Sequence, residues 1–240
     1  MATGNDAQRK VVIVTGASRG IGAGLVQAFR DLGYAVVANA RAIEPSTDPD
    51  VLTIAGDISL RATASDIVER ALRRFGRIDT LINNAGAFMS KPFTEYQDAD
   101  FADLVATNLG GFFHVTQAAI VPMLEQRAGH VVNMAASVAD HPSSRVPAVL
   151  TSLTKGGLTA ATRALALEYA ARGIRVNAVS PSATNSAKQA VPVQTPATTL
   201  QPLGRMAEIA DVVGAVLYLE SAPFVTGEIL HVDGGESAGQ

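Results

Sequence analysis

The stretch Val11-Val-Ile-Val-Thr15-Gly16-Ala-Ser-Arg19-Gly20-Ile-Gly22 decides the fold of this 240-residue chain. Its first four residues are β-branched and apolar, which is typical of a strand buried on both faces of a parallel sheet. Three glycines follow at a Gly-xxx-Gly-x-Gly spacing, and apolar periodicity over residues 21–32 predicts a helix directly after them. Glycines let a backbone approach an anion closely, and a helix N-terminus presents unpaired N–H groups to it. The stretch therefore predicts a loop that binds a dinucleotide diphosphate; the alternative is a tight turn without a ligand.

Composition favours a single domain over residues 1–240 and argues against several classes of function. Hydrophobic residues make up 48% of the chain and charged residues 17%, so a large core can form. The net charge is −3 and Lys and Arg form no run, which argues against nucleic acid or an anionic membrane as a partner. The chain has no cysteine, which excludes disulfides, thiol nucleophiles and cysteine-bound metals. The polar first ten residues and the lack of a membrane-length apolar segment predict a soluble, cytoplasmic protein.

Strand-like and helix-like segments alternate along the rest of the chain. Short apolar segments predict further strands at residues 35–38, 51–55, 80–83, 130–134, 175–180 and 227–232. Helical periodicity lies between them and predicts two long helices, at residues 98–126 and 150–171. This alternation is typical of an α/β, doubly wound, Rossmann-type sheet with helices on both faces. Residues 187–203 lack periodicity, so we expect a flap there.

Ligands of this architecture bind beyond the carboxyl ends of the strands, where polar and glycine residues gather in this sequence. We expect the cofactor-binding residues in the glycine loop and after the second, third, fourth and sixth strands. They are Gly16, Ser18, Arg19, Gly20, Ile21 and Gly22 in the loop, then Asn39, Arg41, Asp57, Ile58, Asn84, Ala85, Gly86, Pro181, Thr184 and Ser186.

The residues after the second strand predict NADP(H) rather than NAD(H). In dinucleotide folds, an acid about 20 residues after the glycine loop holds the adenosine ribose hydroxyls. Here that place is Asn39-Ala40-Arg41, and no acidic residue occurs before Glu44. Arg41, together with Arg19 from the glycine loop, is suited to pair with a 2′-phosphate. The alternative is that both arginines are only solvated.

Together these motifs resemble the short-chain dehydrogenase/reductase family over residues 10–235. Residues 15–22 resemble the family's glycine-rich cofactor loop, and residues 83–86 resemble the segment that stabilises its central sheet. Residues 175–181 and 227–235 resemble its sixth strand and its C-terminal strand. The resemblance implies a seven-stranded sheet of order 3-2-1-4-5-6-7 and a homo-oligomer, commonly a tetramer, with a dimer as the alternative.

The family's active site usually combines an Asn, a Ser, a Tyr and a Lys. The resemblance assigns three of these roles to Asn108, Ser137 and Lys155, with Lys155 also contacting the nicotinamide ribose. The family's tyrosine stands four residues before the lysine, where this chain has Thr151. A phenol has a pKa near 10 and can act as acid and base, whereas an aliphatic hydroxyl does not ionise in the accessible pH range. We therefore expect Thr151 only to orient the substrate or to relay a proton through water.

Two lesser departures from the family pattern lie nearby. Residues 133–137 are one residue longer than the family's usual approach to its serine, and Ser182 replaces a glycine after the sixth strand. The resemblance still implies that Thr184, through its backbone N–H, and Ser186, through its hydroxyl, contact the nicotinamide carboxamide.

The missing tyrosine leaves three hypotheses for function. In the first, the chain is an NADP(H)-dependent oxidoreductase for a small carbonyl or alcohol, and His141, Asp140 or Lys155 through water supplies the proton. Tyr96 is a lesser candidate for this role. In the second, the substrate is a cationic imine, which needs no protein acid. In the third, the chain binds NADP(H) without catalysis, as a sensor or an assembly subunit.

The residues expected to border the substrate are mostly apolar, which favours a neutral, moderately hydrophobic small molecule. They are Phe88, Met89, Val146, Val149 and the flap. The four histidines show no metal-ligand spacing, so we expect no metal.

Overall fold

The computed structural model describes residues 9–185 and 201–238. All seven predicted strands form, and their bounds differ from the expected ones by only a few residues. They are β1 (Val11–Thr15), β2 (Ala35–Ala40), β3 (Val51–Ala55), β4 (Thr80–Asn83), β5 (Gly129–Met134), β6 (Ile174–Pro181) and β7 (Ile229–Val232). Their order in the sheet is β3-β2-β1-β4-β5-β6-β7, and every pairing is parallel. The expected strand order is therefore confirmed.

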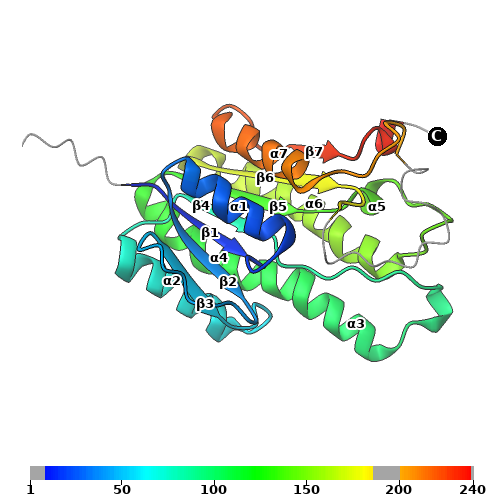
Figure 1. Ribbon diagram of the computed structural model, residues 1–240, viewed down its shortest axis with the longest axis horizontal. Coiled ribbons are helices and arrows are strands. Elements are labelled where there is room, and N and C mark those ends of the chain that lie inside the picture. The colour runs from blue at the N-terminus through cyan, green and yellow to red at the C-terminus, as the bar shows by residue number, and fades with distance from the viewer. Residues whose placement is uncertain (1–8, 186–200, 239–240) are drawn as a thin grey trace, which may run out of the picture.

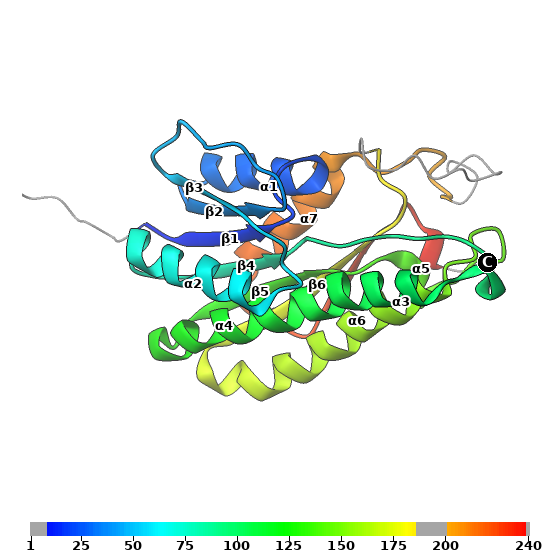
Figure 2. The same cartoon turned by 90° about the horizontal axis from the view of Figure 1, so that it is seen from below.

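Helices connect the strands as the alternation predicts. They are α1 (Gly20–Asp31), α2 (Arg61–Phe75), α3 (Asp98–Leu104), α4 (Gly111–Gln126), α5 (Ser137–Asp140), α6 (Val149–Tyr169) and α7 (Ile209–Ser221). Short 3₁₀ turns are η1 (Phe93–Glu95), η3 (Ala170–Arg172) and η5 (Glu236–Ala238). Helices α1 and α7 cover one face of the sheet, and α2, α4 and α6 cover the other (Figures 1 and 2). This layering confirms the doubly wound architecture.

The side chains of β1 alternate between the two layers of core. Val11 and Ile13 pack in the cluster that contains buried residues of α2, α4 and α6. Val12 and Val14 pack in the cluster that contains buried residues of α1 and α7. Both faces of the strand are covered, which explains why its sequence is continuously apolar rather than alternating.

The helix expected over residues 98–126 forms, but it is not a regular α-helix throughout. A π-helical segment, η2 (Val105–Gly110), joins α3 to α4. The apolar stripe runs on through this segment, so the sequence gives no sign of the change in hydrogen bonding. A π-segment inside an α-helix often marks a functional position.

The same 29-residue helix is long and apolar enough, by length and composition alone, to cross a membrane. The expectation that no segment approaches this length and hydropathy is therefore wrong. Core helices of globular domains pass the same test, and Val115, Ala119 and Met123 of this helix are completely buried against the sheet cluster. Burial of one apolar face against a sheet is sufficient to explain its hydropathy.

Candidate active site

The glycine loop between β1 and α1 has the geometry of an anion-binding turn. Gly16 and Gly20 have φ angles of +66° and +57°, a region in which glycine is favoured. A Cβ atom on Gly22 would lie 2.2 Å from the carbonyl oxygen of Gly16, so only glycine fits there. No side chain in the described part of the chain caps the N-terminus of α1 at Arg19, and the first turn contains no acidic residue. The open helix N-terminus fits a diphosphate group.

Hydrogen bonds between Asn84 and Thr15 hold this loop against the end of β4. The Asn84 Nδ2 atom donates to the carbonyl oxygens of Thr15 and Gly16 at 2.9 and 3.1 Å. In return, Thr15 Oγ1 accepts hydrogen bonds from the backbone nitrogens of Asn84 and Ala85. The loop is therefore prearranged by residues 69 and 70 positions away in the chain.

Asn39 supports the loop from β2 rather than presenting its side chain to a ligand. Its amide is 1% exposed and donates to the carbonyl oxygens of Ile54 and Gly56. The carbonyl oxygen of Asn39 accepts a hydrogen bond from Ala17 in the glycine loop, at 2.8 Å. Sequence reasoning identified the right position but not this supporting role.

The two arginines that we expect to bind the 2′-phosphate are both exposed at the carboxyl edge of the sheet. Arg19 is the N-cap residue of α1 and Arg41 follows β2, and neither forms an ion pair with another residue of the described ranges. Asp57 lies after β3, where a hydrogen bond from the Ser59 backbone, opposed by burial and aided by Arg41, lowers its pKa. The Ile58 side chain is buried in the core against Gly111, so only its backbone is available to a ligand.

Asn108 lies inside the π-helical segment, and the segment directs its amide toward the loop after β4. Its Oδ1 atom accepts a hydrogen bond from the backbone nitrogen of Ala87 at 2.8 Å. Its Nδ2 atom donates to the carbonyl oxygen of Ala87 and to Thr154 Oγ1, each at 3.0 Å. Asn108 is 2% exposed and thus joins η2, α6 and the β4 loop into one unit.

Lys155 points from α6 to the same place. Its Nζ atom donates to the carbonyl oxygen of Met134 at 2.7 Å, and only 7% of the residue is exposed. A Cβ atom on Gly86 would lie 2.9 Å from Lys155 Nζ, so a glycine at this position leaves room for the ammonium group. Lys155 and Asn108 therefore meet at Gly86.

Thr151 contacts the loop after β4. Its hydroxyl is completely buried and lies 3.0 Å from both the backbone nitrogen and the carbonyl oxygen of Met89. The hydroxyl donates to the Met89 carbonyl oxygen and accepts from the Met89 nitrogen, and neither backbone group is an acid that could replace a proton passed to a substrate. Thr151 therefore anchors the loop after β4, a structural role that the sequence does not indicate.

Ser137 has a partner that sequence reasoning missed. Its Oγ atom donates a hydrogen bond of 3.0 Å to Oε2 of Glu236, which lies just after β7. Burial raises the pKa of Glu236, the charge of Asp233 raises it further, and Ser137 and His141 lower it by less. Glu236 directly follows Gly234-Gly235, a position that the family resemblance did not assign to the active site.

The side chains proposed to substitute for the tyrosine have other partners. His141 is exposed, and its ring packs edge-on against that of His231 with centroids 6.0 Å apart. Asp140 lies 3.4 Å from His231 Nε2. The Tyr96 hydroxyl donates to the carbonyl oxygen of Met89 at 3.2 Å, which is the same atom that Thr151 contacts.

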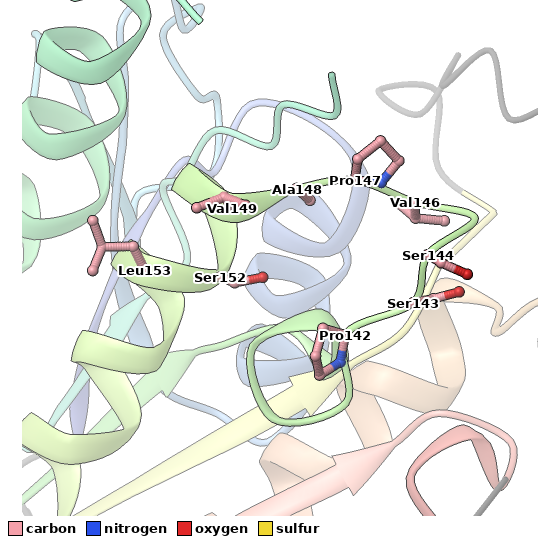
Figure 3. A pocket seen from close by; sticks show the side chains of 9 residues that line it. All are labelled: Pro142, Ser143, Ser144, Val146, Pro147, Ala148, Val149, Ser152 and Leu153. Carbon is pink, nitrogen blue, oxygen red and sulfur yellow. The ribbon is translucent and has the colours of Figure 1, made fainter. Parts of the chain in front are cut away.

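A cavity of about 520 Å³ lies beside this site but does not contain the catalytic candidates (Figure 3). It is formed by residues 142–144 and 146–149 together with Ser152 and Leu153 of α6. Thr151 and Lys155 do not line it, because they lie on another face of the helix. Of the expected substrate-bordering residues that the structure describes, Val146 and Val149 line this cavity, whereas Phe88 and Met89 do not.

The loop after β6 is held in place by Gln201, a second residue that sequence reasoning missed. Gln201 is 3% exposed, and its Nε2 atom donates to Ser182 Oγ and to the carbonyl oxygen of Ala183. Thr184 is buried nearby, and Pro181 ends β6 beside Val232. Ser186 and residues 187–200 of the expected flap lie outside the described residues.

Within residues 9–185 and 201–238, no group of three or more His, Asp or Glu side chains is arranged to hold a metal ion.

Comparisons with known proteins agree with this geometry. A family model described as "Enoyl-(Acyl carrier protein) reductase" matches residues 16–237. L-fucose dehydrogenase of Bos taurus is 38% identical, over 100% of this chain and 93% of the relative. The structure of ElxO with NADP bound has a TM-score of 0.88 at 26% identity, covering 96% of this chain and 100% of that one. The 3-ketoacyl-(acyl-carrier-protein) reductase of Brucella melitensis complexed with NADH also has a TM-score of 0.88, at 30% identity, covering 95% and 98%.

Proposed function

Because the chain belongs to the short-chain dehydrogenase/reductase family, we propose that it is an NADP(H)-dependent oxidoreductase for a small, mostly apolar carbonyl or imine and the corresponding alcohol or amine. The observation that carries this proposal is the convergence of two groups at one edge of the sheet. The glycine loop at α1 is one group, and Asn108, Ser137 and Lys155 are the other. A nicotinamide cofactor supplies hydride chemistry, while the protein supplies binding and orientation.

The preference for NADP(H) rests on charge. Arg19 and Arg41 offer positive charge at the position where the adenosine ribose is held in this architecture, and no acidic residue takes the place of Arg41. The similar solved structures include one with NADP and one with NADH, so the fold accommodates both. The arginines therefore carry the choice between the two cofactors.

The substrate class follows from the lack of a phenol and from the exposed apolar residues near the site. Phe88 is 40% exposed and directly precedes Met89, the residue that Thr151 anchors. A neutral carbonyl needs a proton when it accepts hydride, whereas an iminium does not, because the hydride neutralises its charge. The proposal includes both neutral carbonyls and iminium ions as substrates. Because L-fucose dehydrogenase is a relative, small sugars are the third class of compound to assay.

The test measures NADPH oxidation in the presence of matched panels of ketones, cyclic imines and aldoses. The fall in nicotinamide absorbance reports the rate. We expect turnover of at least one class, with NADPH preferred to NADH. Turnover of imines with ketone rates far below them would assign the imine reaction. Equal affinity for NADPH and NADH would contradict the assignment of Arg19 and Arg41.

A second candidate function is supported by the burial of Thr151. The site has no phenol at the family's position and the replacing hydroxyl is fully engaged with Met89, so the chain could bind NADP(H) without turning over a substrate. Calorimetric titration with NADPH distinguishes the two. Tight binding without oxidation of NADPH by any of the three panels would favour a sensor or an assembly subunit.

We also propose that the chain forms a homo-oligomer through α4 and α6. Five large apolar side chains on these helices are about half exposed or more: Phe113, Val121, Val149, Leu153 and Leu167. Exposed apolar residues on neighbouring helices of one face are typical of a subunit interface. Light scattering after size exclusion would give the mass, and a monomer at micromolar concentration would contradict the proposal.

A further inference from the structure

We propose that Glu236 is the proton source that replaces the missing tyrosine, and that it acts through the hydroxyl of Ser137. The inference rests on the proposed oxidoreductase function and names the group that completes it. Glu236 comes from the segment after β7 and Ser137 from the first residue of α5, so the sheet brings together two groups 99 residues apart.

The contact geometry supports a relay rather than a chance proximity. Ser137 is 4% exposed and its Oγ atom lies 3.0 Å from Glu236 Oε2, within the range of a hydrogen bond. Glu236 itself is only partly buried, so its carboxyl group can exchange protons with solvent. A proton donor needs both properties: a buried contact to the reacting side and an exit to water.

The charges around Glu236 come from three segments. Asp233 lies in the turn before it, His141 follows α5, and Ser137 begins α5. Burial and Asp233 favour the protonated carboxyl group, and they outweigh the opposing contributions of Ser137 and His141. His231 and Asp140 pair with each other at 3.4 Å next to His141. The surroundings therefore raise the pKa of Glu236 above its ordinary value, with burial as the main cause.

The proton and electron balance of the relay is complete for the reduction of a carbonyl. The carbonyl carbon accepts a hydride from the reduced nicotinamide, which breaks the C=O π bond and places the electron pair on oxygen. When Glu236 is protonated, the hydrogen bond with Ser137 reverses, so that the carboxyl group donates to Ser137 Oγ and the serine proton is free to face the substrate. The substrate oxygen then takes the proton of Ser137 Oγ as Ser137 Oγ takes the proton of Glu236. The products are an alcohol, the oxidised nicotinamide and the Glu236 carboxylate, which regains a proton from water. In alcohol oxidation the same steps run in reverse.

The other polar groups near the site are already engaged. The Thr151 hydroxyl and the Tyr96 hydroxyl both donate to the carbonyl oxygen of Met89. The Lys155 ammonium donates to the carbonyl oxygen of Met134. Among the described residues, Glu236 is the one carboxyl group hydrogen-bonded to Ser137.

The first experiment compares the pH dependence of NADPH-driven reduction in four proteins: the wild type, Glu236→Gln, Glu236→Asp and the control Glu228→Gln. Glu228 is an exposed glutamate at the opposite end of β7. In the wild type, kcat should fall as the pH rises through the pKa of Glu236, because the acid form is lost. Glu236→Gln should lower kcat by about 10²-fold or more and remove this dependence. Glu236→Asp should retain the dependence, and Glu228→Gln should match the wild type.

A second measurement needs no turnover. Infrared difference spectroscopy of the unliganded protein should show a protonated carboxyl group that titrates above the ordinary range of glutamate. The band should be missing from Glu236→Gln. It should titrate at still higher pH in Ser137→Ala, because the Ser137 hydrogen bond lowers the pKa of Glu236.

The outcomes separate this inference from the proposed function. Wild-type turnover with an unchanged pH profile in Glu236→Gln overturns the relay and leaves the oxidoreductase function intact. If the pH dependence of kcat is lost in His141→Gln but retained in Glu236→Gln, the proton comes from His141. That result also overturns the relay through Glu236. A rise in KM for imines alone would make Glu236 a binding group for a cationic substrate. Lack of turnover in the wild type contradicts the proposed function, and a carboxyl group that titrates in the ordinary range then contradicts the relay independently.

Discussion

The hydroxyl of Thr151 bridges the two backbone polar groups of Met89, at 3.0 Å from the nitrogen and 3.0 Å from the carbonyl oxygen. The helix α6 and the loop after β4 are thereby joined at the position where the family has its tyrosine. This position therefore has no phenol, and its threonine hydroxyl holds the loop in place instead.

Thr151→Val should therefore reduce stability rather than change the proton chemistry. Valine has nearly the same shape, but it leaves the backbone N–H of Met89 without its partner, which costs about 1–3 kcal/mol. Urea unfolding measures the loss. Thr159→Val is the matched control, because Thr159 is buried on the same helix and its hydroxyl contacts the helix carbonyl of Gly156. A pH profile of catalysis that changes in Thr151→Val would contradict the structural role.

Gly22→Ala should abolish binding of the dinucleotide while the sheet still forms. The new Cβ atom would lie 2.2 Å from the carbonyl oxygen of Gly16, so the loop must move away from its anion-binding shape. Calorimetry with NADPH should show at least a tenfold loss of affinity. Gly214→Ala in α7 is the control, since its Cβ atom would meet no atom within 4 Å. Equal affinities in the two variants would show that the loop does not bind the cofactor.

Arg41→Asp should shift the cofactor preference toward NADH. A guanidinium–phosphate contact contributes about 1.5–3 kcal/mol, and a carboxylate in its place repels the 2′-phosphate, so the ratio of NADPH to NADH affinity should fall by at least about tenfold. Arg172→Asp is the control, because η3 lies before β6, at the opposite edge of the sheet. An unchanged ratio in Arg41→Asp would assign the selectivity elsewhere.

A buried polar network far from the site should govern stability in mildly acidic solution. His130 Nδ1 lies 2.7 Å from Glu220 Oε2, and Tyr34 and Thr80 also donate to this carboxylate. Burial lowers the pKa of His130, although Glu220 opposes the effect. Burial alone would raise the pKa of Glu220, but the hydrogen bonds from His130, Tyr34 and Thr80 hold it below its ordinary value.

The direction of the pH effect on stability follows from the lowered pKa of His130. The folded protein keeps His130 neutral, whereas the unfolded chain takes up its proton below a pH of about 6.5, so stability falls as the pH drops below that value. The titration of His130 alone changes the free energy of unfolding by at most about 1.4 kcal/mol per pH unit. Unfolding free energies measured from pH 7.5 to 5.5 should show a shallower slope in His130→Gln than in the wild type. A slope that His130→Gln leaves unaltered would locate the titration in another group.

Local signals in the sequence predicted most of the fold. The apolar β1 strand, the three glycines and the alternation of elements each depend on neighbouring residues, so their patterns identify them. Asn108, Lys155 and Ser137 were placed by resemblance, and the structure brings Asn108 and Lys155 together at Gly86. Their contacts could not be predicted from spacing, because they depend on the order of the strands.

Two features had no local signal. Glu236 meets Ser137 only because β7 ends at the same edge of the sheet as β5, and nothing near either residue indicates the other. The role of Thr151 depends on where the Met89 loop lies, which a missing tyrosine does not reveal. The identity of the Thr151 side chain predicts that it cannot act as an ionising acid. Its contact with Met89 depends on tertiary packing, which the sequence does not show.

The π-helical segment η2 has a consequence for how this chain can change in length. A π-turn contains one more residue than an α-turn, and Asn108 faces Ala87 only because that extra residue is accommodated there. Deleting one residue between α3 and Asn108 would allow a regular α-helix, with better backbone hydrogen bonds, but would rotate the asparagine by about 100° relative to α3. We therefore expect a single-residue deletion in this segment to displace Asn108 from Ala87 even where a substitution on the exposed face of the helix does not. The spacing between α3 and α4 is therefore as strict a requirement of the site as the identity of Asn108.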